Sequence, residues 1–440
     1  MTSPDIIKID FAAAIEAAVK FAEAEKNGVS YAAPRVRKLD AATVIKMVTL
    51  FGGNSLQKEI RDYPGADCAV SSFVEARERV DSAVFYDALM RFNAQYDPAS
   101  APCFKGKRLL GLDGTCINTA FAPASPSFMP STTSSKGGYN QYKATIYLDL
   151  LSHIPVDIAL QPISRQDELG SAMGMLAFNP PPTPSVCVCD RLYSAYSFIA
   201  DIIAADNLDF VIRTKQGNGA LKPIQGLPME EFDIDKQIIL TDSQSKASKE
   251  QGHIYISTGS KRGKANSPKT YISRFSQPLP YVMNLRIVRV KLPTGTYSTL
   301  LSSLSRNEFS KQDLAQIYKY RWNQELFFRH VKNDCALNRM HSKKEDFSRQ
   351  QIYAAFLFSS AVWKIVNSVA IQQNESNVYE YAVNIKMASY LVREFLRTPD
   401  ADGAKLLREL TRYVVPIRPD RNEERRLVPK SFVPFTYRIA

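Results

Sequence analysis

The sequence predicts an α/β protein in which a mixed β-sheet is flanked by helices, extended by an inserted all-β subdomain, and bordered by helical N- and C-terminal regions. Three observations support this prediction. The first hundred residues show helical apolar spacing, residues 101–215 alternate short apolar runs with helical patterns, and residues 216–300 hold short strands among Gly, Pro, Ser and Lys. A chain of 440 residues is long enough for about two to four domains.

The N-terminal region, residues 1–100, is predicted to be helical and to bind DNA. An Ala- and Glu-rich helix ends near Asn27-Gly28, and residues 71–92 carry apolar side chains at helical spacing with arginines nearby. An amphipathic helical cap with no DNA-binding role explains the same pattern equally well.

The first part of the predicted α/β core covers residues 101–215. Strands are expected at 107–115, 143–151, 154–163, 185–190 and 208–215, and helices at 164–178 and 192–206. The first strand is predicted to end at Asp113-Gly114 and the fourth at Asp190. Ser164 and Asp167 are placed as a capping box for the first of these helices.

Residues 216–300 are predicted to form the β-rich insertion, and residues 301–385 the second part of the core. Ser310 and Asp313 form a predicted capping box, and Phe309 and Leu314 form a predicted hydrophobic staple, so a helix is expected to begin there. The remaining residues, 386–440, are predicted to be helical and then basic.

The composition favours a polyanionic partner. Lys and Arg number 56 against 44 Asp and Glu, a formal net charge of +12, which favours nucleic acid over a membrane surface. Six cysteines and four histidines lack zinc-binding spacing, and the N-terminus lacks a signal-peptide pattern. The apolar run at 352–371 contains Lys364 and is interpreted as a core helix. A cytoplasmic protein without a membrane span is expected.

One helix face carries an unusual polar set. In YKYRWNQELFFRHVK, residues 318–332, the side chains of Tyr318, Arg321, Glu325 and Lys332 fall within a sector of roughly 60°, and Arg329 joins them. An exposed stripe of ordinary ion pairs would alternate in sign, whereas here one acid stands among cations. The pattern therefore favours a binding site on this face.

Glu325 is expected to meet two aspartates at the edge of the sheet. Asp113 and Asp190 each end a predicted buried strand, where α/β sheets place their chemistry, although an aspartate at a strand end is more often a turn former. Three carboxylates held together need cations, and oxygen ligands select Mg²⁺ or Mn²⁺. Two such ions would serve phosphodiester cleavage, with Arg321 and Lys332 binding phosphate.

These residues resemble those of the DDE transposases of bacterial insertion sequences, in particular the cut-and-paste family with the Tyr-Arg-Glu-Lys signature. Its spacing, Y-x2-R-x3-E-x6-K, is matched by Tyr318, Arg321, Glu325 and Lys332. The resemblance implies an RNase H-like core whose metal ligands are Asp113, Asp190 and Glu325, with Tyr318, Arg321 and Lys332 on the terminal phosphates and hairpin.

The resemblance also implies a reaction and its partners. Mg²⁺-dependent hydrolysis nicks the element end, the freed 3′-OH forms a hairpin, and the reopened end joins target DNA. The partners are the terminal inverted repeats and the target, bound by a homodimer in the synaptic complex. Members of the family stack a flipped base on a Trp of the insertion. In this chain an aromatic residue must substitute for it; the candidates are Tyr255, Tyr271, Phe275 and Tyr281.

Two alternatives stay open at this point. An RNase H-like nuclease would cut DNA without joining it, and a catalytically inactive derivative would bind the ends regardless of metal. The long β-insertion and the phosphate-binding signature favour the transposase over the first, and the presence of all three acids favours it over the second.

Overall fold

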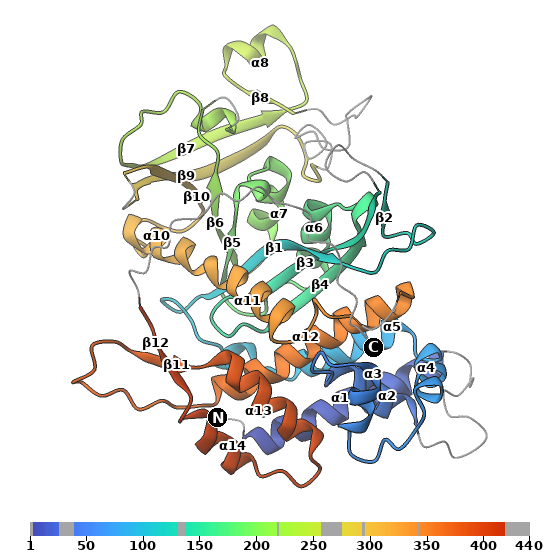
Figure 1. Ribbon diagram of the computed structural model, residues 1–440. Helices are drawn as coiled ribbons and strands as arrows, with labels where there is room; N and C mark the ends of the chain where they lie inside the picture. Colours follow the sequence, from blue (N-terminus) through green and yellow to red (C-terminus); the bar gives the residue numbers. More distant parts are fainter. Residues whose placement is uncertain are drawn as a thin grey trace.

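A ten-stranded mixed sheet forms the centre of the protein in the computed structural model (Figure 1). The structure describes residues 3–25, 39–130, 137–217, 220–256, 275–292, 295–340 and 343–418. The strand order is β2-β3-β1-β5-β6-β10-β9-β7-β8, with β4 paired to β3. The strands are β1 (Arg108–Asn118), β2 (Phe128–Met129), β3 (Tyr139–Asp149), β4 (Pro155–Pro162), β5 (Ser185–Cys189), β6 (Leu208–Thr214), β7 (Phe232–Thr241), β8 (Ile254–Tyr255), β9 (Tyr281–Lys291) and β10 (Tyr297–Ser302).

Helices cover both faces of this sheet and also form most of the N-terminal and C-terminal regions that the structure describes. They are α1 (Pro4–Glu25), α2 (Ala41–Thr49), α3 (Leu56–Arg61), α4 (Val70–Glu78), α5 (Ser82–Ala94), α6 (Glu168–Phe178), α7 (Tyr196–Ala204), α8 (Lys246–Glu250), α10 (Lys311–Tyr320), α11 (Trp322–Asn333), α12 (Glu345–Asn367), α13 (Ile385–Arg397) and α14 (Gly403–Leu410). A small two-stranded antiparallel sheet of β11 (Tyr381–Val383) and β12 (Val414–Pro416) lies beside α13 and α14, which connect the two strands.

Alternation along the central strands divides the core into two layers. Leu110, Leu112, Cys187 and Cys189 pack with α6 and α7 on one face. The opposite face, including Leu109 and residues of β5, packs with α11, α12 and the N-terminal helices. This is the period of two expected of strands buried on both faces. The predicted α/β fold, a mixed sheet with flanking helices, is confirmed.

The strand directions follow the predicted pattern of a meander and then parallel strands. β1 pairs antiparallel with β3, and β3 pairs antiparallel with β4. β5 runs parallel to β1 and to β6, with α6 and α7 forming the connections. The strands from the predicted insertion continue the same sheet, because β9 pairs with β10 and β7 pairs with β9.

Helix α12 crosses the sheet face and joins it to both ends of the chain. It packs against α2, α5 and α13, and most of its residues are buried. Figure 1 shows the N-terminal helices beside α12, α13 and α14. The interpretation of the run at 352–371 as a core helix is confirmed up to Asn367, where α12 ends. No helix in the described ranges is long and apolar enough to cross a membrane.

Four predicted boundaries were wrong. β1 does not end at Asp113-Gly114 but continues to Asn118, because β3 pairs with it beyond the Asp-Gly pair. The single helix expected at 71–92 is two helices, and Asp81 caps the second by accepting a hydrogen bond from the Ala83 amide.

The start of α6 differs too. Asp167 is itself the N-cap, accepting from the Gly170 amide, and Ser164 lies in a separate 3₁₀ turn. The expected helix at 192–206 is likewise preceded by a 3₁₀ turn, Arg191–Tyr193, and begins at Tyr196. Both helices begin later than apolar periodicity indicates: Asp167 caps α6, whereas Asp190 caps the 3₁₀ turn that precedes α7.

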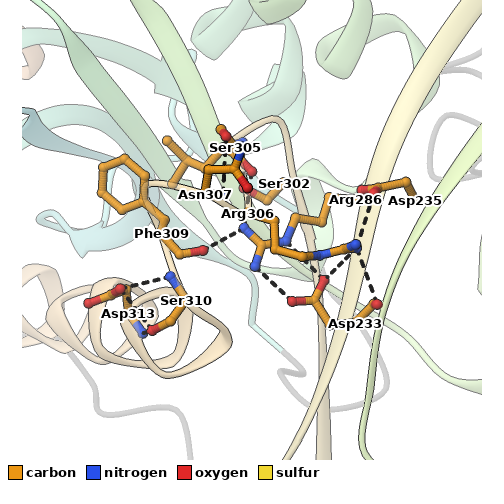
Figure 2. A network of polar contacts seen from close by, with 11 residues as sticks. Asp233, Asp235, Arg286, Ser302, Ser305, Arg306, Asn307, Phe309, Ser310 and Asp313 are labelled. Carbon is orange, nitrogen blue, oxygen red and sulfur yellow. Dashed lines mark hydrogen bonds and ion pairs between the residues drawn. The ribbon is translucent and has the colours of Figure 1, made fainter.

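A buried polar network fixes the beginning of α10 against β9 and β7 (Figure 2). Arg286 donates through Nε and Nη2 to the carboxylate of Asp233 at 2.9 and 2.8 Å, and through Nη1 to the Phe309 carbonyl at 2.8 Å. The predicted capping box of Ser310 and Asp313 is present, and Phe309 is buried. Local signals and this network together determine where α10 begins.

Candidate active site

Asp113 and Asp190 lie next to each other on adjacent parallel strands. Leu112 of β1 is the register partner of Cys189 of β5, so the residues that follow them, Asp113 and Asp190, stand about one strand spacing apart. Asp190 follows the last residue of β5 and accepts a hydrogen bond from the Leu192 amide at 2.8 Å. The two aspartates are therefore brought together at one edge, although Asp113 lies within its strand rather than at its end.

Arg321 joins Asp113 to Glu325. Its Nη1 lies 3.4 Å from Oδ2 of Asp113, and its Nη2 lies 2.7 Å from Oε1 of Glu325. Arg321 occupies the junction between α10 and α11. Two hydrogen bonds between residues three apart tighten the turn here: the Arg321 amide donates to the Tyr318 carbonyl, and the Gln324 amide donates to the Arg321 carbonyl. The predicted single helix is thus two helices, but their polar face stays continuous across the junction.

Buried contacts hold α11 against β3 and the neighbouring β1. Gln324 is fully buried and donates to the Ile146 carbonyl at 2.9 Å, and Asn323 donates to the Leu150 carbonyl at 2.8 Å. A Cβ on Gly111 of β1 would stand only 2.3 Å from Oε1 of Gln324. The absence of a side chain at Gly111 therefore lets α11 approach closely enough for Arg321 to reach Asp113.

Tyr318 lies at the same edge, beside two arginines. The Arg321 guanidinium is 5.8 Å from the centre of its ring. Burial raises the pKa of Tyr318 above its ordinary value, while the positive charges of Arg321 and Arg213 beside it act in the opposite direction. Arg213 belongs to β6, so three neighbouring strands, β1, β5 and β6, each bring a charged residue to this edge.

Lys332 and Arg329 occupy different environments on α11. The Nζ of Lys332 donates to Oγ1 of Thr115 at 2.7 Å, which places this half-buried lysine two residues along β1 from Asp113. Burial lowers the pKa of Lys332 below its ordinary value. Arg329 is exposed on the helix surface.

A fourth acid, Glu168, lies close to Asp113. Glu168 begins α6 and pairs with Lys143 at 2.6 Å, and it accepts from the Tyr193 hydroxyl at 3.0 Å. A Cβ on Gly114 would stand 2.6 Å from the Glu168 carboxyl carbon, so this glycine provides the space for the carboxylate to reach β1.

The pKa of Asp113 reflects these neighbouring negative charges. Burial first, and then the negative charges of Glu168 and Asp190, raise the pKa of Asp113 from 3.8 to about 6. The backbone amide of Gly114 and the nearby Arg321 act in the opposite direction without cancelling the effect. An acidic site with this unbalanced charge favours a cation.

The oxygen chemistry of the donor set, rather than its present arrangement, suits hard divalent ions. Asp113, Asp190 and Glu325 supply only carboxylate oxygens, the ligands that Mg²⁺ and Mn²⁺ prefer. Within the part of the chain that the structure describes, no three Asp, Glu, His or Cys side chains are arranged to hold one metal ion. The Arg321 guanidinium lies between Asp113 and Glu325 and provides the positive charge that those two carboxylates share.

Sequence reasoning missed four residues of this site. They are Thr115, Lys143, Glu168 and Arg213, which contact or lie beside the predicted residues. Lys143 and Glu168 carry no local signal, because their pairing depends on how β3 and α6 pack. Arg213 offers one weak signal, a charge in the otherwise apolar strand LDFVIRT.

The aromatic candidates for base stacking fall in two groups. Tyr255 is exposed on β8, and Phe275 and Tyr281 form an edge-to-face pair with ring centres 5.5 Å apart. Tyr271 lies outside the described residues.

Comparison with known proteins places this geometry in context. Residues 104–360 match the family described as the transposase DDE domain. InsL of insertion sequence element IS186A from Escherichia coli strain K12 is 22% identical over 342 residues, which cover 74% of this chain and 85% of InsL. The transposase of insertion sequence element IS421 from Escherichia coli is 22% identical over 343 residues, with the same coverage. A piggyBac transposase, solved as a synaptic complex with hairpin DNA, aligns with a TM-score of 0.47 and 10% identity, covering 96% of this chain and 87% of that chain.

Proposed function

Because the chain belongs to the transposase DDE domain family, we propose that it catalyses Mg²⁺-dependent cut-and-paste transposition of an insertion sequence, with Asp113, Asp190 and Glu325 as its acidic triad. The observation that carries this assignment is the contact of Arg321 with both Asp113 and Glu325, next to Asp190. It joins residues more than 200 positions apart into one acidic cluster with a cationic centre.

The three carboxylates would hold two Mg²⁺ or Mn²⁺ ions. Bound there, the ions would supply a nucleophile at neutral pH and stabilise the charge that develops on the leaving oxygen. Asp113 must lose its proton to serve as a ligand, and its pKa of about 6 leaves it mostly ionised at neutral pH.

The cationic residues bind and orient the DNA. Arg321 exchanges its carboxylate partners for a phosphate when the acids are neutralised, and its planar fork then holds two phosphate oxygens. Lys332, fixed by Thr115, adds a point charge beside β1, and Tyr318 packs against the same phosphate. Arg329, exposed one turn after Glu325, contacts the backbone outside the site.

Each chemical step is an in-line displacement at phosphorus. In the first, a water oxygen bonds to phosphorus, its proton is lost, and the 3′-oxygen leaves. In the next, that 3′-OH attacks the opposite strand, so one P–O bond forms as another breaks and a hairpin results. Hydrolysis reopens the hairpin, and the 3′ end then attacks target DNA. We assign these steps to a synaptic homodimer bound to both terminal inverted repeats.

The test uses DNA that carries the inverted repeats flanking the gene, with labelled target plasmid and Mg²⁺. Replacing Glu325 by Gln keeps the hydrogen-bonding shape but removes the charge, and we expect cleavage to fall by roughly 10²–10³-fold or more. Glu375→Gln, at an exposed position away from the site, should cleave like the wild type.

Three results would overturn the proposal. If Glu325→Gln cleaves DNA as well as the wild type, Glu325 is not a member of a catalytic triad. If the wild-type protein cleaves DNA but forms no joined product, the chain is a nuclease that does not transfer strands. Binding without cleavage by the wild-type protein would identify an inactive derivative.

A further inference from the structure

A basic pocket lies between the end of α11 and α13, outside the acidic cluster. Its volume is about 350 Å³, and its lining includes Lys332, Arg339, Lys386, Arg393, Asp334 and Tyr390. Four of these side chains are cationic and one is acidic. We call this hollow the α11–α13 pocket.

The one acid in this set does not neutralise the cations. The carboxylate of Asp334 faces His330, with Oδ2 3.3 Å from Nδ1 of the buried ring. Its backbone carbonyl, rather than its carboxylate, accepts a hydrogen bond from Nη2 of Arg393 at 3.1 Å. The α11–α13 pocket therefore keeps a net positive charge.

Arg393 is a buried cation with incomplete hydrogen bonding. Its side chain is 8% exposed, its guanidinium lies 4.3 Å from the centre of the Phe358 ring, and its Nε is without a hydrogen-bond partner among the described residues. Burial lowers its pKa below the ordinary value. Arg393 lines the pocket and adds positive charge to it, and the negative charges of Glu59 and Glu394 also act on this guanidinium.

Lys332 connects this pocket to the acidic cluster. It lines the pocket and also donates to Thr115, two residues after Asp113 on β1. Glu325 and Lys332 are seven residues apart on α11, or roughly 10 Å along the helix axis. A DNA strand rises about 3.4 Å per nucleotide, so a strand that runs along α11 spans this distance in about three nucleotides.

The α13 side of the pocket offers surface for a nucleic-acid strand. Lys386 is exposed in the first turn of α13, and Tyr390 follows one turn later with 56% of its surface exposed. A cation next to an exposed aromatic ring is the combination used to bind single-stranded backbone and to stack a base.

We propose that the α11–α13 pocket is a second phosphate-binding site, which holds the DNA backbone about three nucleotides from the scissile phosphate. This inference rests on the proposed function, because it takes the strand entering the acidic cluster as the ligand. Lys386 and Arg393 contact phosphate, Lys332 is shared between the two sites, and Tyr390 faces the adjoining nucleotide.

The experiment measures binding of the full chain to a fluorescent random-sequence duplex of about 20 base pairs, without Mg²⁺, between 50 and 200 mM salt. The slope of log affinity against log salt is negative, and loss of one phosphate contact reduces its magnitude by about 0.9. The affinity then falls by about threefold less between 50 and 200 mM salt. We expect this change for Lys386→Ala, and we expect Lys386→Arg to restore the wild-type slope. Lys405→Ala removes an exposed lysine from neighbouring α14, outside the pocket lining, and should leave the slope unchanged.

The outcomes separate this proposal from the function. A wild-type slope for Lys386→Ala, or an equal change for Lys405→Ala, overturns the second phosphate site, whatever Glu325→Gln does to cleavage. If Lys386→Ala reduces the magnitude of the slope while Glu325→Gln still cleaves, the pocket stands as a DNA-binding site and the proposed triad fails.

Discussion

Replacing Asp113 by Asn should stabilise the protein at neutral pH while removing its proposed catalytic role. Asp113 is mostly buried, with its side chain 21% exposed, and its carboxylate faces the negative charges of Glu168 and Asp190. Keeping it ionised therefore costs folding free energy. Asn has nearly the same shape and can still accept the hydrogen bond from the Gly114 amide, 2.8 Å away in the wild type.

The magnitude follows from the pKa of Asp113. A carboxyl pKa raised from 3.8 to about 6 corresponds to about 3 kcal/mol of unfolding free energy lost when the group is ionised. This value already includes the favourable contact with Arg321. It is an upper limit for the variant, because Asn leaves Arg321 with one carboxylate partner instead of two, and we expect a gain of about 1–3 kcal/mol at pH 7.5.

The pH dependence has a definite sign. Below pH 3.8 Asp113 is protonated in both folded and unfolded chains, so wild type and variant should differ little. Between pH 4 and 6 the folded wild type binds more protons than the unfolded chain, so the wild type loses stability as the pH rises. The advantage of Asp113→Asn should therefore grow through this window and reach its full value above pH 6.

The assay is urea unfolding followed by tryptophan fluorescence, in EDTA, at intervals from pH 4 to 7.5. Asp206→Asn, at an exposed position, is the control and should show no pH-dependent gain. Added Mg²⁺ should raise the unfolding midpoint of the wild type at pH 7.5 but not that of Asp113→Asn, because a ligand that binds only the folded state stabilises it. A variant less stable than wild type at pH 7.5, or a gain equal at pH 4 and 7.5, would refute the reasoning.

Two further predictions concern the residues that surround the site. Glu168→Gln removes a negative charge that raises the pKa of Asp113, so the acid limb of Mg²⁺-dependent cleavage should move to lower pH, as a pH–rate profile will show. Arg286→Met removes a buried cation that pairs with Asp233, and we expect unfolding to cost about 3–5 kcal/mol less in urea titrations.

Each of these has a matched control in the chain. Lys143→Met leaves Glu168 without its cation and should move the acid limb in the opposite direction; equal shifts for both variants would contradict the electrostatic account. Arg306→Met removes the other partner of Asp233, but this side chain is 47% exposed, so the loss should stay below about 1 kcal/mol. If Arg306→Met and Arg286→Met are equally destabilised, the network in Figure 2 does not fix the start of α10 as we describe.

Features that depend on neighbouring residues were predictable from the sequence. The capping box of Ser310 and Asp313 involves residues three apart, and it was confirmed. The apolar run SVCVC predicted a buried strand, and all five residues are buried. The i, i+4 relation of Arg321 and Glu325 follows from helix geometry, and it survives the junction between α10 and α11.

Features that depend on distant partners were not predictable in this way. β1 continues past Asp113-Gly114 because β3 supplies hydrogen bonds there, a partner that no local pattern reveals. Gly114 looked like part of a turn, yet in the fold it makes room for Glu168 from α6. The contact of Arg321 with Asp113 needs β1 and the α10–α11 junction, 208 positions apart in the chain, to pack face to face.

The sequence by itself determined the types and order of the elements and which charged residues share a helix face. These properties arise from dihedral preferences, caps and periodicity within a few residues. Only the tertiary structure decided that Asp190 stands beside Asp113, that Glu168 raises the pKa of Asp113, and that Arg321 spans two carboxylates. Those relations are set by side-chain packing and charge across separate elements, where energy depends on distances in space rather than along the chain.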